Sequence, residues 1–173
     1  MNSLIIYSTT DGQTKKICET IKDSSINKNS YEILSLEEAF SKKIDSYDQI
    51  IIGASIRYGK HSPKVYKFID ENKVILDKKK NAFFSVNVVA RKSDKNTPET
   101  NPYIKKFLKK TNWKPKKIGV FAGKIDYPKL GFVNKNVIRL IMFITNGPTN
   151  VNNVYEFTDW QSVKKFVNEF DKM

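Results

Sequence analysis

Five short apolar runs recur along the chain, and amphipathic helical patterns lie between most of them. The runs are SLIIYS (3–8), YEILSL (31–36), YDQIIIGAS (47–55), NAFFSVNVVA (81–90) and KKIGVFAG (116–123). Strands that are apolar on both faces are typical of a parallel sheet with helices covering both sides. The alternation therefore predicts an α/β fold, a doubly wound parallel sheet with right-handed crossovers.

Four helical patterns accompany these strands. They span about 13–24 and start at Ser62-Pro63, at Thr97-Pro98 and after Thr158, where Thr158 and Gln161 fit a capping box. Each helix is expected to bury one apolar face. The side chains predicted to face the sheet are Ile17, Ile21, Val65, Phe68, Ile69, Leu76, Tyr103, Ile104, Phe107, Leu108, Val163, Phe166, Val167 and Phe170.

Length, cysteine content and charge narrow the class of protein. A chain of 173 residues suits one domain, spanning 1–173, and its single cysteine, Cys18, excludes an internal disulfide and favours a reducing compartment. The net charge of +13 attracts nucleic acid, anionic lipid or acidic small molecules. Abundant Lys, Asn and Ile are also what AT-rich coding DNA produces, so charge alone selects no partner. The pattern at the start of the sequence predicts no signal peptide. No apolar run approaches the length of roughly 20 residues that a membrane-spanning helix needs, so none is expected.

The loop after the first strand, STTDGQT, carries more polar groups than a chain reversal requires. Its hydroxyls can donate to an anion, Gly12 permits a tight turn, and the helix from Gln13 directs its positive end at the same point. These features suit a phosphate monoester, whereas an N-capping cluster without a ligand is the alternative. The Walker and G-x-G-x-x-G patterns are absent, so a nucleoside triphosphate or a Rossmann dinucleotide is not expected.

The same loop resembles the T-x-T-G-x-T phosphate loop of flavodoxins, with Asp11 where a threonine is usual. That carboxylate would repel a phosphate unless its side chain turns away. Further motifs, IIGASIRYGKHSP, FFSVNVVARK, TPETNPY, FLKKTNWKP and YEFTDW, resemble the flavodoxin-like, quinone-dependent protoporphyrinogen oxidases of bacteria nearly end to end. The resemblance implies a five-stranded sheet of order 2-1-3-4-5 and a long-chain-type insertion at about 124–152 that splits strand five, with 153–157 as its second half.

The resemblance also implies an activity. It predicts FMN-dependent oxidation of protoporphyrinogen IX to protoporphyrin IX, with electrons passing to menaquinone or ubiquinone at the cytoplasmic face of the bacterial inner membrane. A flavodoxin-type electron carrier and an FMN-dependent quinone reductase are the alternatives among flavoproteins. A basic nucleic-acid-binding protein is the alternative in another class, but no helix-turn-helix, RRM or zinc pattern supports it, so no nucleic-acid partner is expected.

Candidate site residues follow from the family's loops. The residues expected to bind the cofactor are Ser8, Thr9, Thr10, Asp11, Gly12, Gln13, Thr14, Ser55, Ile56, Tyr58, Gly59, Asn87, Val88, Val89, Ala90 and Arg91. Tyr58 would stack on the flavin ring, or else pack on its own loop; Asn87 would hydrogen-bond the ring's edge, or else be an ordinary polar residue at a strand end. Protoporphyrinogen IX carries two propionates. The residues expected to bind them are Arg57, Lys60, Arg91 and Lys92, with Lys95 at the same rim of the expected cofactor site.

Two reactive side chains and one segment remain. His61, the only histidine, is a candidate base with a structural role as the alternative, and Cys18 is not expected to act in redox chemistry; no metal-ligand spacing is present.

The segment 132–144 looks helical and is apolar on most sides. About 20 Å long, it is too short to cross hydrocarbon. It is expected to pack into the core, to lie on an anionic membrane surface, or to form a wall of the substrate or quinone site.

Overall fold

The computed structural model describes residues 2–173 and confirms the predicted parallel sheet. Its strands are β1 (Ser3–Ser8), β2 (Tyr31–Ser35), β3 (Gln49–Ser55), β4 (Lys80–Val86) and β5 (Lys117–Phe121). They pair in the order β2-β1-β3-β4-β5, and every pairing is parallel. All five strands therefore end at the same edge, which is where ligands bind in doubly wound folds.

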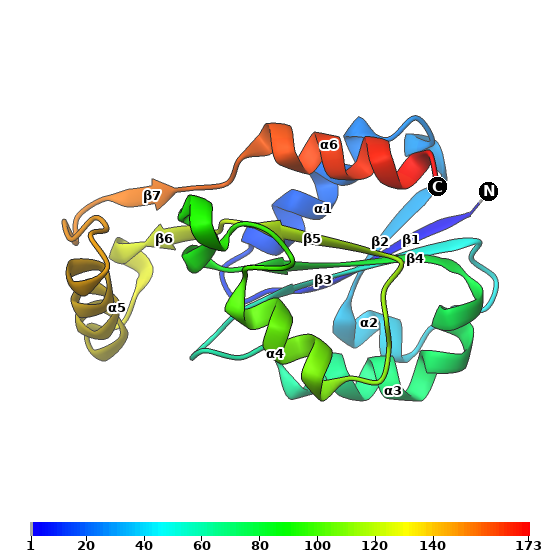
Figure 1. Cartoon of the computed structure of the whole chain (residues 1–173), viewed down its shortest axis with the longest axis horizontal. Coiled ribbons are helices and arrows are strands. Elements are labelled where there is room, and N and C mark those ends of the chain that lie inside the picture. The colour runs from blue at the N-terminus through cyan, green and yellow to red at the C-terminus, as the bar shows by residue number, and fades with distance from the viewer. Residues whose placement is uncertain (1) are drawn as a thin grey trace.

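Helices cover both faces of this sheet (Figure 1). One face is covered by α1 (Gln13–Ser24) and α6 (Trp160–Asp171), and the other by α2 (Leu36–Phe40), α3 (Pro63–Lys78) and α4 (Pro102–Lys110). The predicted inward faces are confirmed for α1, α3 and α6. In α4, Ile104 and Phe107 are buried, whereas Tyr103 is half-buried and Leu108 is exposed, because nine residues present only a narrow stripe to the sheet.

Three element ends and one short helix differ from the expectation. The strand predicted over 81–90 ends at Val86, and 88–91 forms a 3₁₀ turn. The helix predicted from Thr97-Pro98 starts at Pro102, where the side chain of Asn101 caps it. The last helix is capped by Asp159 rather than by the predicted capping box. The short helix α2 was not expected, and it carries a capping box of Ser35 and Glu38.

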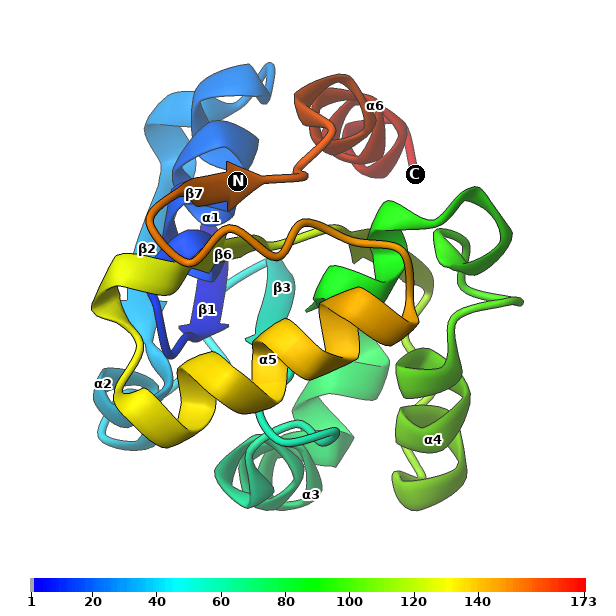
Figure 2. The same cartoon turned by 90° about the vertical axis from the view of Figure 1, so that its left-hand side faces the viewer.

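The insertion forms a separate layer at the carboxyl ends of the strands. Its elements are β6 (Lys124–Asp126), α5 (Phe132–Ile144) and β7 (Val154–Glu156). Because β7 pairs antiparallel with β6 and not with the main sheet, the prediction that 153–157 resumes strand five is wrong. Figure 2 shows α5 crossing in front of β1 and β3. The limits of the helix agree with the prediction, and none of the helices in residues 2–173 has the length and apolar content to span a membrane.

Candidate functional site

The loop between β1 and α1 leaves its backbone open to a ligand. Gly12 has a φ of 80°, a left-handed conformation that favours glycine, and a Cβ placed there would meet no protein atom within 4 Å. Gly12 is the N-cap of α1, and no side chain caps the helix. The hydroxyl of Thr9 instead accepts the Gly12 N–H at 3.0 Å. No side chain of the loop therefore accepts an N–H from the first turn of α1.

Two buried polar atoms at the start of α1 lack a partner among residues 2–173. They are Gln13 Oε1 and Thr14 Oγ1, and both residues line the pocket described below. The other end of the Gln13 amide is fixed, since Nε2 donates to Thr158 Oγ1 at 2.8 Å and that hydroxyl donates to Ala122 O at 2.8 Å. Buried polar groups are nearly always paired. A phosphate ester fits here, because Thr14 can donate to a phosphate oxygen and Gln13 can accept from a sugar-alcohol hydroxyl.

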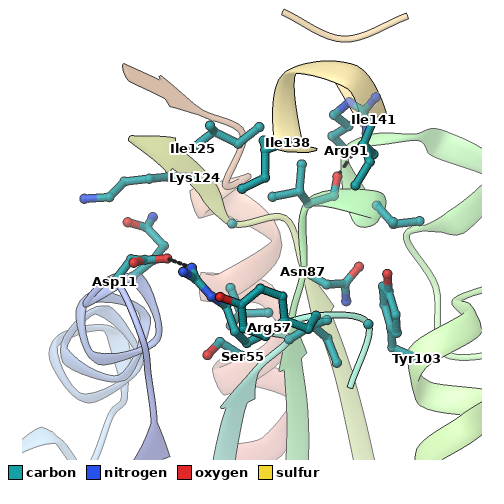
Figure 3. A pocket seen from close by; sticks show the side chains of 18 of the residues that line it. Asp11, Ser55, Arg57, Asn87, Arg91, Tyr103, Lys124, Ile125, Ile138 and Ile141 are labelled. Atoms are coloured by element: carbon teal, nitrogen blue, oxygen red, sulfur yellow. Dashed lines mark hydrogen bonds and ion pairs between the residues drawn. The ribbon is translucent and has the colours of Figure 1, made fainter. Parts of the chain in front are cut away.

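The carboxylate of Asp11 turns away from this loop. Its Oδ2 lies 3.5 Å from Nη1 of Arg57 (Figure 3). The Arg57 guanidinium also lies 5.1 Å from the ring centroid of Tyr58. The pairing reduces the repulsion that Asp11 would exert on a bound dianion. It also places Arg57 across the mouth of the pocket, between the first loop and the loop after β3.

The loop after β3 makes a tight turn beside the pocket. Tyr58 and Gly59 both have positive φ, 49° and 73°, and an antiparallel bridge between Arg57 and Lys60 closes the turn. The Tyr58 side chain is 74% exposed, and its hydroxyl donates to Asn134 Oδ1 of α5 at 3.2 Å. A tyrosine in this strained conformation is consistent with a ring displayed for a ligand.

The loop after β4 is held from below by a buried polar chain. Asn87 Oδ1 accepts from the Ala90 N–H at 3.1 Å and from Asn101 Nδ2 at 3.2 Å, while Asn87 Nδ2 donates to Ser85 Oγ at 3.1 Å. These contacts fix the 3₁₀ turn Val88–Arg91 against the sheet. The Asn87 side chain thus orients the loop, and Val88 and Val89 present its backbone to the pocket.

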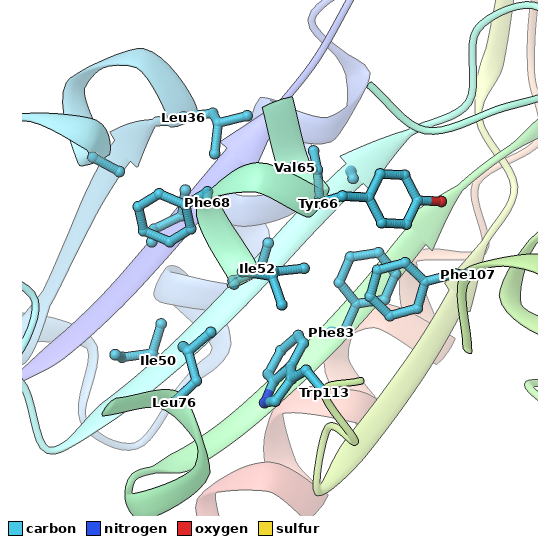
Figure 4. Packing of buried hydrophobic residues seen from close by; sticks show 14 of the residues in the cluster. Leu36, Ile50, Ile52, Val65, Tyr66, Phe68, Leu76, Phe83, Phe107 and Trp113 are labelled. Atoms are coloured by element: carbon cyan, nitrogen blue, oxygen red, sulfur yellow. The ribbon is translucent and has the colours of Figure 1, made fainter. Parts of the chain in front are cut away.

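His61 lies outside this pocket. It is 2% exposed and packs against the rings of Phe83, Phe107 and Tyr66, all of which Figure 4 labels. Its Nε2 lies 3.0 Å from Ser85 Oγ, and burial lowers the pKa of the imidazole to about 4. Because it neither lines the pocket nor titrates near neutrality, the structure does not support His61 as a base. Cys18 is also buried, which raises the pKa of its thiol and makes it unreactive.

One pocket of about 450 Å³ joins these loops to the insertion. Figure 3 shows Ser55, Arg57 and Asn87 on one side of it and Ile125, Ile138 and Ile141 on the other. We call the apolar side the inner wall; it consists of Ile125, Leu130, Val137, Ile138, Ile141 and Met142. Among the described residues, five cations line the pocket. Arg91 is bonded within the fold, and the other four, here called the rim cations, are Arg57, Lys92, Lys95 and Lys124.

The position of α5 separates the three expectations for this segment. Met142 is its only buried residue among those described, and it packs with Ile125 and Tyr127, so most of the helix lies outside the core. The opposite side of the helix, here called the outer face, is exposed and consists of Phe132, Val133, Leu140, Phe143 and Ile144. Arg91 anchors the C-terminal end, since its Nη2 donates to Thr145 O at 3.0 Å and to Thr145 Oγ1 at 2.8 Å. The helix is therefore a wall of the pocket, and Arg91, expected to bind substrate or cofactor, is already engaged in holding it.

Most predicted site residues converge on this pocket. Those that line it are Thr9, Asp11, Gln13, Thr14, Ser55, Ile56, Arg57, Tyr58, Gly59, Asn87, Val88, Val89, Arg91, Lys92 and Lys95. Ser8 ends β1, Thr10 and Gly12 belong to the loop that follows it, Lys60 is exposed beyond the rim, and Ala90 packs into the core. Sequence reasoning assigned no pocket role to Tyr103 or Thr145. The only signal near Thr145 was the apolar character of the helix that ends beside it.

Comparisons with known proteins agree with this geometry. A flavodoxin domain model matches residues 4–152. Protoporphyrinogen IX dehydrogenase [quinone] of Escherichia coli strain K12 is 36% identical over 173 residues, covering 98% of this chain and 94% of the relative. The enzyme of the same name from Leishmania major is 38% identical over 169 residues, covering 96% of this chain and 73% of the relative. The chain belongs to the flavodoxin-like family of quinone-dependent protoporphyrinogen IX dehydrogenases.

Solved structures show the fold of this family at lower identity. Oxidised flavodoxin 1 from Bacillus cereus aligns with a TM-score of 0.54 and 16% identity, covering 99% of this chain and 98% of that one. A flavodoxin from the domain Archaea aligns with a TM-score of 0.53 and 17% identity, covering 99% and 97%. Together with the family model, these similarities establish a flavodoxin fold that implies a flavin cofactor in this member of the dehydrogenase family.

Proposed function

We propose that this protein oxidises protoporphyrinogen IX to protoporphyrin IX through FMN and passes the electrons to a membrane quinone. One observation carries the proposal: a cradle suited to a phosphate ester and a broad apolar wall face each other across a single pocket. The curated relatives that bear the name of this activity support it. A simple electron carrier needs the cradle alone, whereas a wall built from an inserted helix suits an apolar organic substrate.

FMN fits the residues that line the pocket. Thr9, Thr14 and the backbone around Gly12 would hold its phosphate, assisted by the positive end of α1, and Gln13 Oε1 would accept from its ribityl chain. The loops after β3 and β4 would flank its ring. FMN supplies the two-electron chemistry that no side chain can perform. The protein's contribution is to bind, to orient and to exclude water beneath the inner wall.

The substrate's two propionates require cations at the mouth of the pocket. Arg57 and Lys92 are the best-placed candidates among those predicted, and Lys95 and Lys124 extend the same rim. The Arg57–Asp11 contact of 3.5 Å is exposed, with 31% and 51% of the two side chains accessible, so a substrate carboxylate can compete for the guanidinium. Because Arg91 is bonded to Thr145, we assign it to the wall and not to the substrate.

The outer face of α5 is proposed to rest on the cytoplasmic face of a bacterial inner membrane. Five large apolar side chains lie exposed there, with Phe132 82% and Phe143 73% accessible. Lys135 and Arg139 lie on the same helix and Lys129 just before it, and the net charge is +13. An amphipathic helix flanked by cations binds at the headgroup level of anionic lipid. This orientation places the pocket beside the lipid in which quinone and porphyrinogen dissolve.

The activity is tested under anaerobic conditions with purified protein loaded with FMN. Adding protoporphyrinogen IX and a short-chain quinone should produce porphyrin fluorescence and bleach the quinone absorbance in step, beyond a control without protein. A flavodoxin-type carrier would show neither change, and it would accept electrons from a flavodoxin reductase. Absence of fluorescence from a yellow, folded protein would refute the proposed function.

Membrane binding is tested with a matched pair of substitutions on α5. Leu140→Asp changes the outer face and Ile138→Asp changes the inner wall, so the charge and the helix are the same in both variants. Leu140→Asp should lower co-sedimentation with anionic vesicles several-fold, and Ile138→Asp should leave most of it intact. Equal sedimentation of the two variants would contradict the proposed orientation.

A further inference from the structure

We propose that the quinone and the porphyrinogen occupy the same pocket in alternation, sharing the inner wall, and that only the porphyrinogen uses the rim cations. This inference rests on the proposed function and specifies how its two substrates are recognised. It divides the pocket into a common apolar platform and a charged edge that selects for carboxylates. The two parts predict different effects of substitution, which makes the division testable.

The inner wall and the cofactor loops belong to one cavity. The wall residues of α5, such as Ile138 and Ile141, line the same space of about 450 Å³ as Thr14, Tyr58 and Val88. A cavity of this size is at the lower end of the range for one drug-sized ligand, roughly 300–1,000 Å³, so bound FMN would take up much of it and leave one open side against the inner wall. Both redox partners must reach the same cofactor, and this cavity gives them one approach to it.

A second depression beside α5 lies on the outer side of the helix, away from the cofactor loops. It is lined by Asn136, Arg139, Leu140, Phe143 and Thr149 and shares no residue with the pocket. A quinone bound there would be separated by the helix from Gln13 and Thr14. Direct transfer of hydrogen requires contact distances of about 3–3.5 Å between the reacting atoms, so a ligand on that side cannot receive it.

The inner wall is chemically apolar along its whole length. All six inner-wall residues are aliphatic or thioether side chains, and the wall itself carries no charge. A quinone ring is flat, apolar and uncharged, so it needs only this surface. A porphyrinogen offers apolar pyrrole rings of similar character together with two carboxylates, which the rim cations match. Methionine at position 142 adds a flexible side chain that tolerates partners of different shape.

The helix α5, which carries most of the inner wall, is fixed at both ends. Near its N-terminal end Asn134 accepts from the Tyr58 hydroxyl at 3.2 Å, and at its C-terminal end Thr145 is bonded by Arg91 at 2.8 and 3.0 Å. Tyr127 also donates to Pro148 O at 2.9 Å behind the helix. These contacts tie α5 to the loops after β3 and β4, so the distance between the wall and the cofactor loops is set by the fold. A fixed spacing favours one flat ring at a time.

The electron balance of the alternation is complete. Protoporphyrinogen IX loses six electrons and six protons on its way to protoporphyrin IX, in three steps of two electrons and two protons, and each step converts one quinone to its quinol. After each step the tetrapyrrole must leave the wall before the quinone enters, and the quinol must leave before the next step. The scheme needs no oxidant other than the quinone.

The test is a displacement measurement in which no reaction occurs. Protoporphyrin IX and a short-chain naphthoquinone are both fully oxidised, so both can be mixed with the oxidised, FMN-loaded protein. The apparent Kd of protoporphyrin, followed by fluorescence anisotropy, should rise in proportion to quinone concentration without reaching a plateau. A matched titration without protein corrects for quenching by the quinone. An apparent Kd that is unchanged or that levels off would show separate sites and overturn the inference.

Three substitutions locate the shared and unshared parts. Ile138→Asp in the inner wall should weaken both ligands at least tenfold, and Leu140→Asp, lining the outer depression of the same helix, should leave both affinities unchanged. Arg57→Gln at the rim should weaken protoporphyrin several-fold and leave the quinone unchanged. Loss of quinone binding in Leu140→Asp alone would place the quinone on the outer side and refute the proposal.

Failure of this inference is distinguishable from failure of the proposed function. If the protein oxidises protoporphyrinogen with quinone but protoporphyrin and quinone bind independently, the activity stands and the shared pocket is wrong. If protoporphyrin and quinone compete but no oxidation occurs, the pocket is shared and the proposed activity is wrong.

Discussion

The burial of His61 predicts a specific loss of stability in acid. Burial lowers the pKa of this imidazole from 6.5 to about 4, so the folded protein keeps it neutral where the unfolded chain already binds a proton. Acid therefore favours the unfolded state, and stability decreases as the pH falls from 6.5 towards 4. Each pKa unit corresponds to about 1.4 kcal/mol, so the complete effect is about 3 kcal/mol.

The effect is isolated by replacing the side chain. Of the total of about 3 kcal/mol, about 2 kcal/mol of the free energy of unfolding should be lost between roughly pH 7.5 and pH 5. His61→Gln keeps a polar partner for Ser85 Oγ but cannot titrate, and the chain has no other histidine. Urea denaturation of the flavin-free protein, followed by the fluorescence of the buried Trp113, gives the free energy of unfolding at each pH. The wild-type protein should lose about 2 kcal/mol more than the variant over this interval. Parallel losses in the two proteins would refute the reasoning.

Three further substitutions test the cradle, the sheet and the wall. Gly12→Val should weaken FMN binding at least tenfold, because valine is strained at a φ of 80° and its side chain enters the space beside the loop; flavin fluorescence titration measures this, and an unchanged Kd would place the phosphate elsewhere. Gly53→Ala should destabilise the fold by about 1–3 kcal/mol, because the new methyl would lie 2.1 Å from the Phe84 ring, which a thermal melt would detect. Arg91→Met should free the end of α5 at Thr145, so limited proteolysis should cut the insertion faster than in the wild-type protein; an unchanged cutting rate would show that the anchor does not matter.

The elements that sequence reasoning predicted well depend on local signals. β1, β3 and α1 follow from apolar runs and from helical periodicity within about ten residues, and α5 has the limits that its apolar stretch indicated. The errors fall at segment ends. NAFFSVNVVA continues the apolar pattern beyond Val86, but the chain turns there because Asn87 bonds the Ala90 N–H and Asn101. A pattern of hydrophobicity carries no record of such a contact.

What the sequence by itself determined is the parallel sheet and the hydroxyl-rich, glycine-containing loop at its edge, because both are encoded in short continuous segments. The tertiary structure alone decided the roles of the side chains around the pocket. Asp11 meets Arg57 across 46 residues of chain, Arg91 meets Thr145 across 54, and His61 is enclosed by rings from α3, β4 and α4. Whether a charge is free to bind a ligand, or an imidazole free to titrate, depends on neighbours that only the folded chain brings together.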